Sequence, residues 1–176
     1  LAALQSLVHR DGLHAGSTTF RPYVGRDTIW WTRMFLLAHR LMPEMPILKP
    51  AILQTAVSSV LEGISPEGRV AHEVDLRVLP GDAARHTYNT LDTDFLLPSL
   101  IKDYLAVARP EDVSAVLSRT NEAGEPHWLA IARNFDHVLA QGHVLTGGLH
   151  GRQELLGTAG QSISSWRDSW SATAGA

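Results

Sequence analysis

The sequence predicts an all-α fold of helical hairpins packed side by side. Three observations support this prediction. Apolar residues recur at helical spacing in five segments, prolines, glycines and capping residues mark where these segments start and stop, and loops separate them. The chain has 176 residues, 44% hydrophobic and 19% charged, with a mean hydropathy of −0.04. These values are typical of one folded domain, which we expect to span residues 1–176.

The first long helix is expected from Asp27 to Met42, with most of its surface buried. Asp27 would cap its start, and Pro43 prevents its continuation. Arg33 and Arg40 would keep a narrow polar edge. Two adjacent apolar stripes predict the burial: Trp30, Met34, Leu37 and Leu41 form one, and Trp31, Phe35 and Ala38 form the other.

The second helix is expected from Leu48 to Glu62, where Gly63 ends it. Its water-facing residues would be Gln54, Ser58 and Glu62, spaced four apart.

Residues 63–87 carry three glycines, two prolines and several charges, which predicts a long loop. Loops of this length in a folded domain are usually functional or disordered.

Three further helices are predicted, at 93–108, 110–119 and 126–142. Pro110 and Pro126 stand at the expected starts of the last two of these helices. Proline is suited to a first turn, because the amide hydrogen that it lacks would have no helical partner there. Gly142 would end the fifth helix. Beyond it the chain is rich in glycine and serine, so we expect a loop and a frayed end over 171–176.

The composition excludes several classes of protein. The chain has 15 basic and 18 acidic side chains, a net charge of −3, and its arginines are scattered singly, so we expect no nucleic-acid partner. No apolar run reaches the roughly 18 residues of a membrane span. The chain contains no cysteine, which excludes disulfides and thiolate metal sites. Because the sequence begins with Leu1 and not Met, we interpret it as a piece of a longer protein.

The first candidate site follows Tyr23, where Gly25 precedes Arg26 and Asp27 at the predicted start of a helix. A guanidinium beside a carboxylate offers both donors and acceptors, which suits the neighbouring hydroxyls of a polyhydroxylated ligand. The alternative is an N-cap with a local ion pair, which is the more frequent role of such residues.

A second candidate site combines residues 88–95, which end at a helix start, with His72 and Glu73 in the long loop. Asp92 or Thr93 could simply cap that helix. His72 and Glu73 lack a second histidine four residues after the first, so the pattern does not match a zinc-protease helix. We therefore expect no metal, and solvated loop charges remain the alternative for these two residues.

The third candidate is Asp168, flanked by Trp166 and Trp170 after a glycine-rich run. A carboxylic acid against indole rings loses hydration, which favours its protonated form and allows it to donate a proton near neutral pH. The alternative is a surface loop in which one tryptophan is anchored.

Four motifs together resemble the six-hairpin glycosidases. They are Gly-Arg-Asp-Thr at 25–28, Gly-Arg-Val-Ala-His-Glu at 68–73, Tyr-Asn-Thr-Leu-Asp-Thr at 88–93 and Ser-Trp-Arg-Asp-Ser at 165–169. The resemblance is closest to glycogen-debranching-like glucosidases and covers residues 20–104 and 166–169. Glucoamylases and neutral invertases are more distant.

The resemblance implies part of an (α/α)6 toroid, in which six inner and six outer helices surround a sugar site. It also implies hydrolysis of an α-glucan or related oligosaccharide with inversion. Asp168 would be the general acid, and a second carboxylate roughly 6.5–9.5 Å away would activate water. We expect no cofactor. The expected substrate-binding residues are Arg26, Asp27, Trp30, His72, Glu73, Tyr88, Asp92, Trp166 and Arg167.

Twelve helices need several hundred residues, so we expect the general base to lie outside this chain and a further chain or segment to complete the toroid. Two alternatives stay open. One is a non-catalytic carbohydrate-binding or assembly module of the same half-toroid. The other is a helical terpene or prenyl cyclase, which we rank much lower because Asp92-Thr93-Asp94 is too short for its aspartate-rich motif.

Overall fold

The structure is a computed structural model. It describes residues 7–9, 12–13, 23–45, 48–75, 77–80, 82, 85–88 and 92–147. This part of the chain contains five helices, α2 to α6, and two small antiparallel sheets made of two-residue strands. The predicted all-α class is therefore confirmed.

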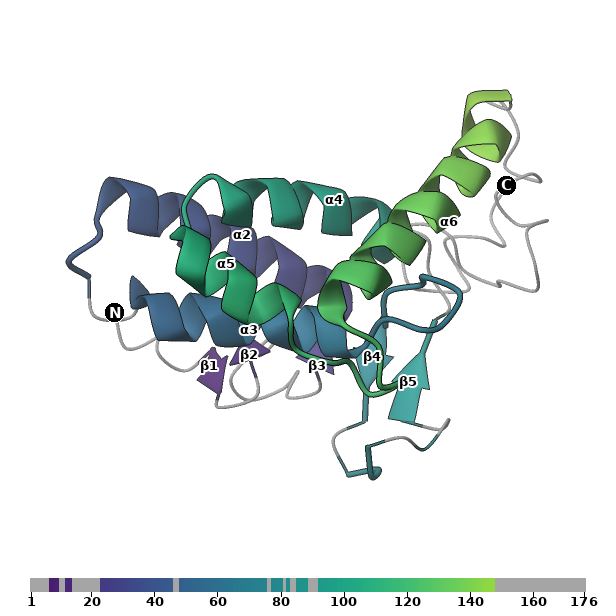
Figure 1. The fold of residues 1–176 in the computed structure, drawn as a ribbon, viewed down its shortest axis with the longest axis horizontal. Helices are drawn as coiled ribbons and strands as arrows, with labels where there is room; N and C mark the ends of the chain where they lie inside the picture. The colour runs from purple at the N-terminus through teal and green to yellow at the C-terminus, as the bar shows by residue number, and fades with distance from the viewer. Residues whose placement is uncertain are drawn as a thin grey trace, which may run out of the picture.

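The helices form two antiparallel hairpins that lie side by side (Figure 1). The first joins α2 (Gly25–Leu41) to α3 (Pro50–Glu62), and the second joins α4 (Asp92–Leu105) to α5 (Pro110–Leu117). Helix α2 packs on both α3 and α4, and it runs parallel to α4. Helix α6 (His127–Gly147) packs on α3, α4 and α5 and then rises away from the hairpins.

Only one of the two predicted apolar stripes of α2 reaches the core. Phe35 of the second stripe is buried together with Ile29 and Leu36, whereas the first stripe is exposed, with Met34 at 55% and Leu41 at 70%. The prediction for the first stripe was wrong because α2 is apolar on nearly every side, so periodicity alone does not identify the face that meets α3 and α4.

Two threonines complete the buried face of α2. Thr28 and Thr32 are fully buried, and their hydroxyls donate to backbone carbonyls: Thr28 to Leu13 at 2.5 Å and Thr32 to Thr28 at 2.7 Å. These hydrogen bonds offset the cost of burying the hydroxyls. Asp27, predicted as the N-cap, lies inside the first turn because α2 begins two residues earlier, at Gly25.

Helix α3 starts at Pro50, two residues after the predicted start, and Gly63 caps its end as predicted. Leu53, Val57 and Leu61 enter the core. Ser58, predicted to face water, is 2% exposed. Its hydroxyl accepts a hydrogen bond from Arg119 Nη1 at 3.2 Å, which allows a polar side chain on this face.

The predicted long loop contains part of a small sheet. Strands β3 (Tyr23–Val24), β4 (Glu73–Val74) and β5 (His86–Thr87) pair in that order, all antiparallel. The other sheet pairs β1 (Val8–His9) with β2 (Gly12–Leu13). The three-stranded sheet places the start of α2 beside residues 71–74.

Helix α6 continues through Gly142 to Gly147, so our prediction that Gly142 ends it was wrong. A glycine inside a helix costs only about 1 kcal/mol, so glycine is a weak stop signal on its own. The side that packs on the bundle carries His127, Ala130 and Asn134, all fully buried.

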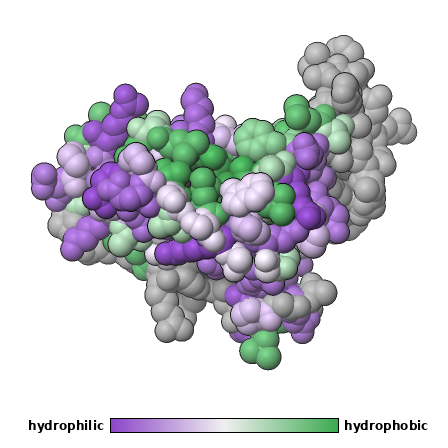
Figure 2. Space-filling model, in the orientation of Figure 1, coloured by the Kyte–Doolittle hydropathy of each residue, from purple (hydrophilic) through white to green (hydrophobic). Residues whose placement is uncertain are grey.

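The surface in Figure 2 is mixed in character. Hydrophobic surface gathers in the middle of this face, where Figure 1 places α4, α5 and the first turns of α6. Within the described residues, no helix is both long and apolar enough to cross a membrane.

Candidate functional site

Gly25 places the start of α2 directly against the 71–72 backbone. Its N–H donates to the carbonyl of His72 at 2.7 Å, and a Cβ at this position would lie 1.9 Å from the carbonyl oxygen of Ala71. Only glycine allows this close approach. The two residues that follow, Arg26 and Asp27, are therefore held at the junction of α2 and the small sheet.

Arg26 joins the starts of two helices that lie far apart in the sequence. Its Nε is 3.4 Å from Oδ1 of Asp27, and its Nη1 is 3.5 Å from Oδ2 of Asp92 at the start of α4. The side chains of Arg26 and Asp92 are 17% and 20% exposed, and that of Asp27 is 37% exposed. The structure therefore brings together three of the predicted site residues in a partly open polar cluster.

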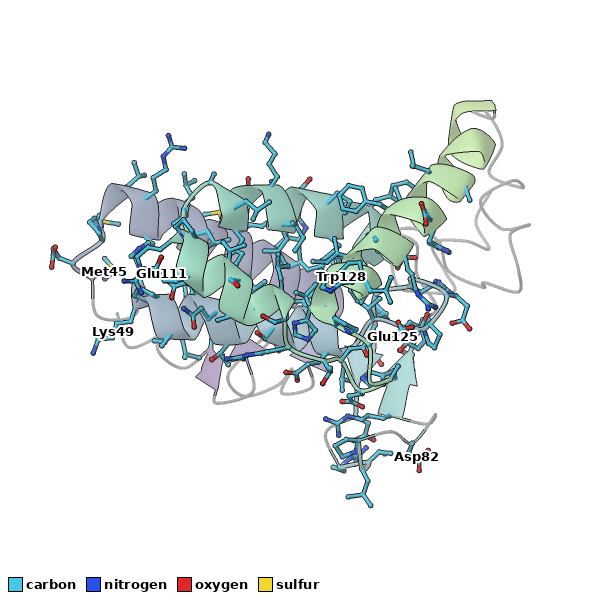
Figure 3. All side chains as sticks on the ribbon, in the orientation of Figure 1. Met45, Lys49, Asp82, Glu111, Glu125 and Trp128 are labelled. Atoms are coloured by element: carbon cyan, nitrogen blue, oxygen red, sulfur yellow. The ribbon has the colours of Figure 1, made fainter. Side chains whose placement is uncertain are left out.

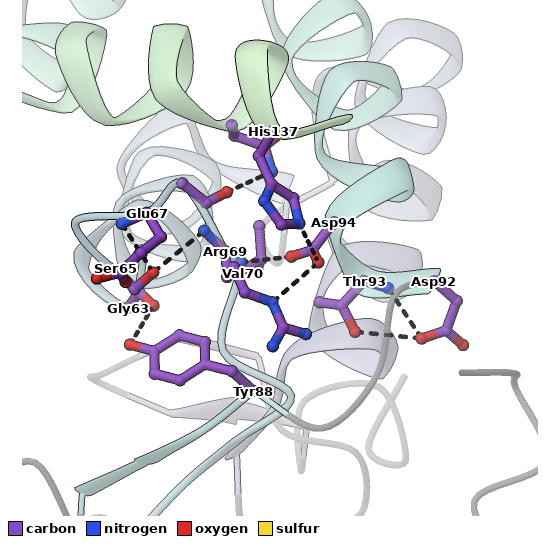
Figure 4. A network of polar contacts seen from close by, with 12 residues as sticks. Gly63, Ser65, Glu67, Arg69, Val70, Tyr88, Asp92, Thr93, Asp94 and His137 are labelled. Carbon is purple, nitrogen blue, oxygen red and sulfur yellow. Dashed lines mark hydrogen bonds and ion pairs between the residues drawn. The ribbon is translucent and has the colours of Figure 1, made fainter. Parts of the chain in front are cut away.

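Asp92 also forms a local hydrogen bond in the first turn of α4. Its Oδ1 accepts the backbone N–H of Thr93 at 2.8 Å, which ties the carboxylate to the start of α4 (Figure 4). Its other oxygen faces Arg26. The carboxylate of Asp92 thus accepts a hydrogen bond within the first turn of α4 and also forms an ion pair with Arg26. The hydrogen bond orients the carboxylate for the ion pair.

Trp30 lies one turn after Arg26 on α2, so the two side chains share a face of the helix. The indole is 48% exposed, and the guanidinium carbon of Arg33 lies 5.0 Å from its ring centroid. A flat apolar ring beside donors and carboxylates can pack on the C–H face of a sugar while the polar groups bind its hydroxyls.

The other predicted binding residues in the described region lie on or next to strands β4 and β5. His72 is 4% exposed, and Glu73 is exposed on β4. Tyr88 donates from its hydroxyl to the carbonyl of Gly63 at 3.2 Å and points away from Asp92 (Figure 4). Burial raises the pKa of Tyr88 to about 12. Trp166, Arg167 and Asp168 lie outside the described residues.

The sequence did not reveal a buried ionic network around Asp94. This carboxylate is fully buried. Its Oδ1 accepts the N–H of Val70 at 2.6 Å, while its Oδ2 lies 3.5 Å from Nε of Arg69 and 3.4 Å from Nε2 of His137 (Figure 4). The network joins α4, the 63–72 loop and α6, and it fixes the helix turn that carries Asp92.

A pocket of about 90 Å³ lies farther along the bundle. Its apolar lining includes Leu36, Leu53 and Tyr104, and its polar lining includes His39 and Arg109. Leu36 is ten residues along α2 from Arg26, about 15 Å at 1.5 Å per residue, so this pocket is separate from the polar cluster.

No three metal-binding side chains lie close enough together within the described residues to hold a metal ion. Comparisons with family models, curated proteins and solved structures give no match.

Proposed function

We propose that this chain is part of a glycoside hydrolase that acts on an α-glucan or related oligosaccharide. The observation that supports the proposal most directly is the cluster of Arg26, Asp27 and Asp92 beside the exposed indole of Trp30. This set combines hydrogen-bond donors, acceptors and an aromatic surface within reach of one sugar ring.

In the proposed reaction, Asp168 protonates the departing glycosidic oxygen as the bond to the anomeric carbon breaks. A carboxylate from a further chain or segment removes a proton from water, which attacks the opposite face of the ring. Arg26, Asp27 and Trp30 bind and orient the sugar, and they transfer no proton.

Sugar binding by the cluster is tested by calorimetric titration with maltotriose and panose. We expect the Asp27→Asn and Trp30→Ala variants each to weaken binding about tenfold, because each removes a charge-assisted hydrogen bond or a packing surface. Glu44→Gln is the matched control, because Glu44 is exposed beyond the end of α2. Equal affinity in all four proteins would contradict the proposed site.

Catalysis is tested separately in the native polypeptide. We expect Asp168→Asn to lower sugar release about a hundredfold or more, with little change in sugar affinity, because a general acid acts in the transition state. Turnover close to that of the unmodified protein would show that Asp168 is not the acid.

A second candidate is a non-catalytic carbohydrate-binding module. It is favoured by the composition of the described cluster, in which both carboxylates pair with the guanidinium of Arg26, an arrangement of acceptors and donors that suits the binding of sugar hydroxyls. The module predicts binding of maltotriose by the native polypeptide without any product, whereas the hydrolase predicts release of glucose.

A further inference from the structure

Helix α2 presents an apolar stripe to the outside of the bundle. Trp30, Met34, Leu37 and Leu41 are spaced at i, i+4, i+7 and i+11, and their exposed fractions range from 48% to 70%. This spacing places the four side chains in one row, opposite the buried face of the same helix. An exposed apolar row of this kind commonly marks an interaction surface.

Helix α6 carries a second row with the same spacing. Trp128, Ala132, Phe135 and Leu139 follow at i, i+4, i+7 and i+11, and all four are exposed, with Trp128 at 55% and Leu139 at 67%. Trp128 is labelled at the start of α6 in Figure 3. The two rows therefore have the same length and spacing, which allows the side chains of one to pack along the other.

The edges of the two rows carry opposite charges. Arg33 and Arg40 border the α2 row on one side, and Asp136 borders the α6 row on the side that would face those arginines if the helices packed in parallel. Arg33 also bonds Asp103 at 2.6 Å. Arg40 and Asp136 form no ion pair within the described part of the chain, so each has charge available for a partner.

We propose that α2 of one copy of this chain packs in parallel on α6 of a second copy. Antiparallel pairing of α2 with itself would bring the two arginine edges together, which opposes that contact. The proposed contact joins two different surfaces, so in a dimer one copy keeps its α6 row uncovered and the other keeps its α2 row uncovered. A third copy can therefore bind to either end. The contact itself requires no sugar, but Trp30 belongs both to the α2 row and to the proposed sugar site, so a second copy packed on this row would compete with sugar.

Sedimentation velocity over a concentration series tests the contact in the absence of sugar. The unmodified chain is expected to form dimers and larger species as its concentration rises. Met34→Lys with Leu37→Lys should give a monomer, and so should Phe135→Lys with Leu139→Lys. All four side chains are exposed, so helix content by circular dichroism should stay unchanged.

Mixing the two monomeric variants is the deciding measurement. One variant keeps an intact α6 row and the other keeps an intact α2 row, so the mixture should form a 1:1 dimer and nothing larger. Leu79→Lys is the matched control, because Leu79 is 78% exposed outside both helices and should leave association unchanged. The charge reversals Arg40→Asp and Asp136→Arg should each weaken association about tenfold, and the double reversal should restore it.

Three outcomes would overturn the proposal. A native chain that stays monomeric at all concentrations shows that a second copy does not cover these rows. A Phe135→Lys, Leu139→Lys variant that still dimerises shows that α2 pairs with α2. A mixture that stays monomeric shows that the two rows do not bind each other.

Discussion

Asp94 accepts a hydrogen bond at 2.6 Å from the backbone N–H of Val70, 24 residues earlier in the chain. The carboxylate is fully buried, and Arg69 and His137 approach its other oxygen. A buried carboxylate is stable only with such partners, because losing one leaves a charge or a donor without compensation.

Replacement of Asp94 should therefore cost much more stability than replacement of an exposed aspartate. We expect Asp94→Ala to lower the free energy of unfolding by about 3 kcal/mol or more, measured by urea denaturation. Asp103→Ala, which breaks the more exposed ion pair with Arg33, should cost about 1 kcal/mol or less. Similar losses in the two variants would contradict the role assigned to Asp94.

Gly25→Ala should destabilise the chain through a direct clash. The added Cβ would lie 1.9 Å from the carbonyl oxygen of Ala71, so the backbone must shift; we expect a loss of about 2–3 kcal/mol in thermal unfolding. At Gly124, φ is +78° and no atom lies within 4 Å of a Cβ. Gly124→Ala should cost only the backbone strain, about 1 kcal/mol. A larger loss of stability in Gly124→Ala than in Gly25→Ala would show that the 71–72 backbone can move away from the added Cβ.

The two faces of α2 should respond differently to truncation. Leu36 is 1% exposed, and Leu36→Ala should cost about 2–5 kcal/mol because it opens a cavity. Met34 is 55% exposed, and Met34→Ala should change stability by about 0.5 kcal/mol or less. Urea titration of both variants at low protein concentration checks this; a large loss at Met34 alone would mean that the faces are reversed.

Burial of His127 predicts a pH dependence of stability. Burial lowers the pKa of His127, although its Nδ1 contacts the carbonyl of Val116 at 2.9 Å. Between the lowered pKa and the ordinary value of about 6.5, the unfolded chain binds more protons than the folded chain, so stability rises with pH. We expect unfolding free energy to increase from about pH 5 to pH 7.

His127→Asn should reduce that increase. His86, whose pKa is also lowered by burial, still contributes in this variant, so part of the pH dependence should remain. Urea denaturation at several pH values measures both slopes. An unchanged slope in His127→Asn would rule out a contribution from this imidazole.

Local chemistry made most of the fold predictable. Pro50, Pro110 and Gly63 mark helix ends in the structure because a missing amide or a capping glycine acts within one turn. The buried face of α2 was not predictable in this way. Which face is buried depends on the placement of α3 and α4, and threonines such as Thr28 look polar although their hydroxyls bond within the core.

The polar cluster was predictable only in part. Arg26 and Asp27 stand together in the sequence, and the motif resemblance predicted that Asp92 lies in the same site. Asp94 was missed because an acid in the first turn of a helix is usually an exposed partner of the helix dipole. Its burial is compensated by Arg69 and His137, which come from distant segments.

Two ion pairs connect the same pair of parallel helices. Arg26 meets Asp92 at their first turns, and Arg33 meets Asp103 two turns further along α2. If α4 slid along α2 by one residue, about 1.5 Å, both ion-pair distances would change. The axial position of α4 is thus set at two levels, and the spacing between the Asp27 and Asp92 carboxylates follows from it, as a fixed dimension that any bound molecule must match.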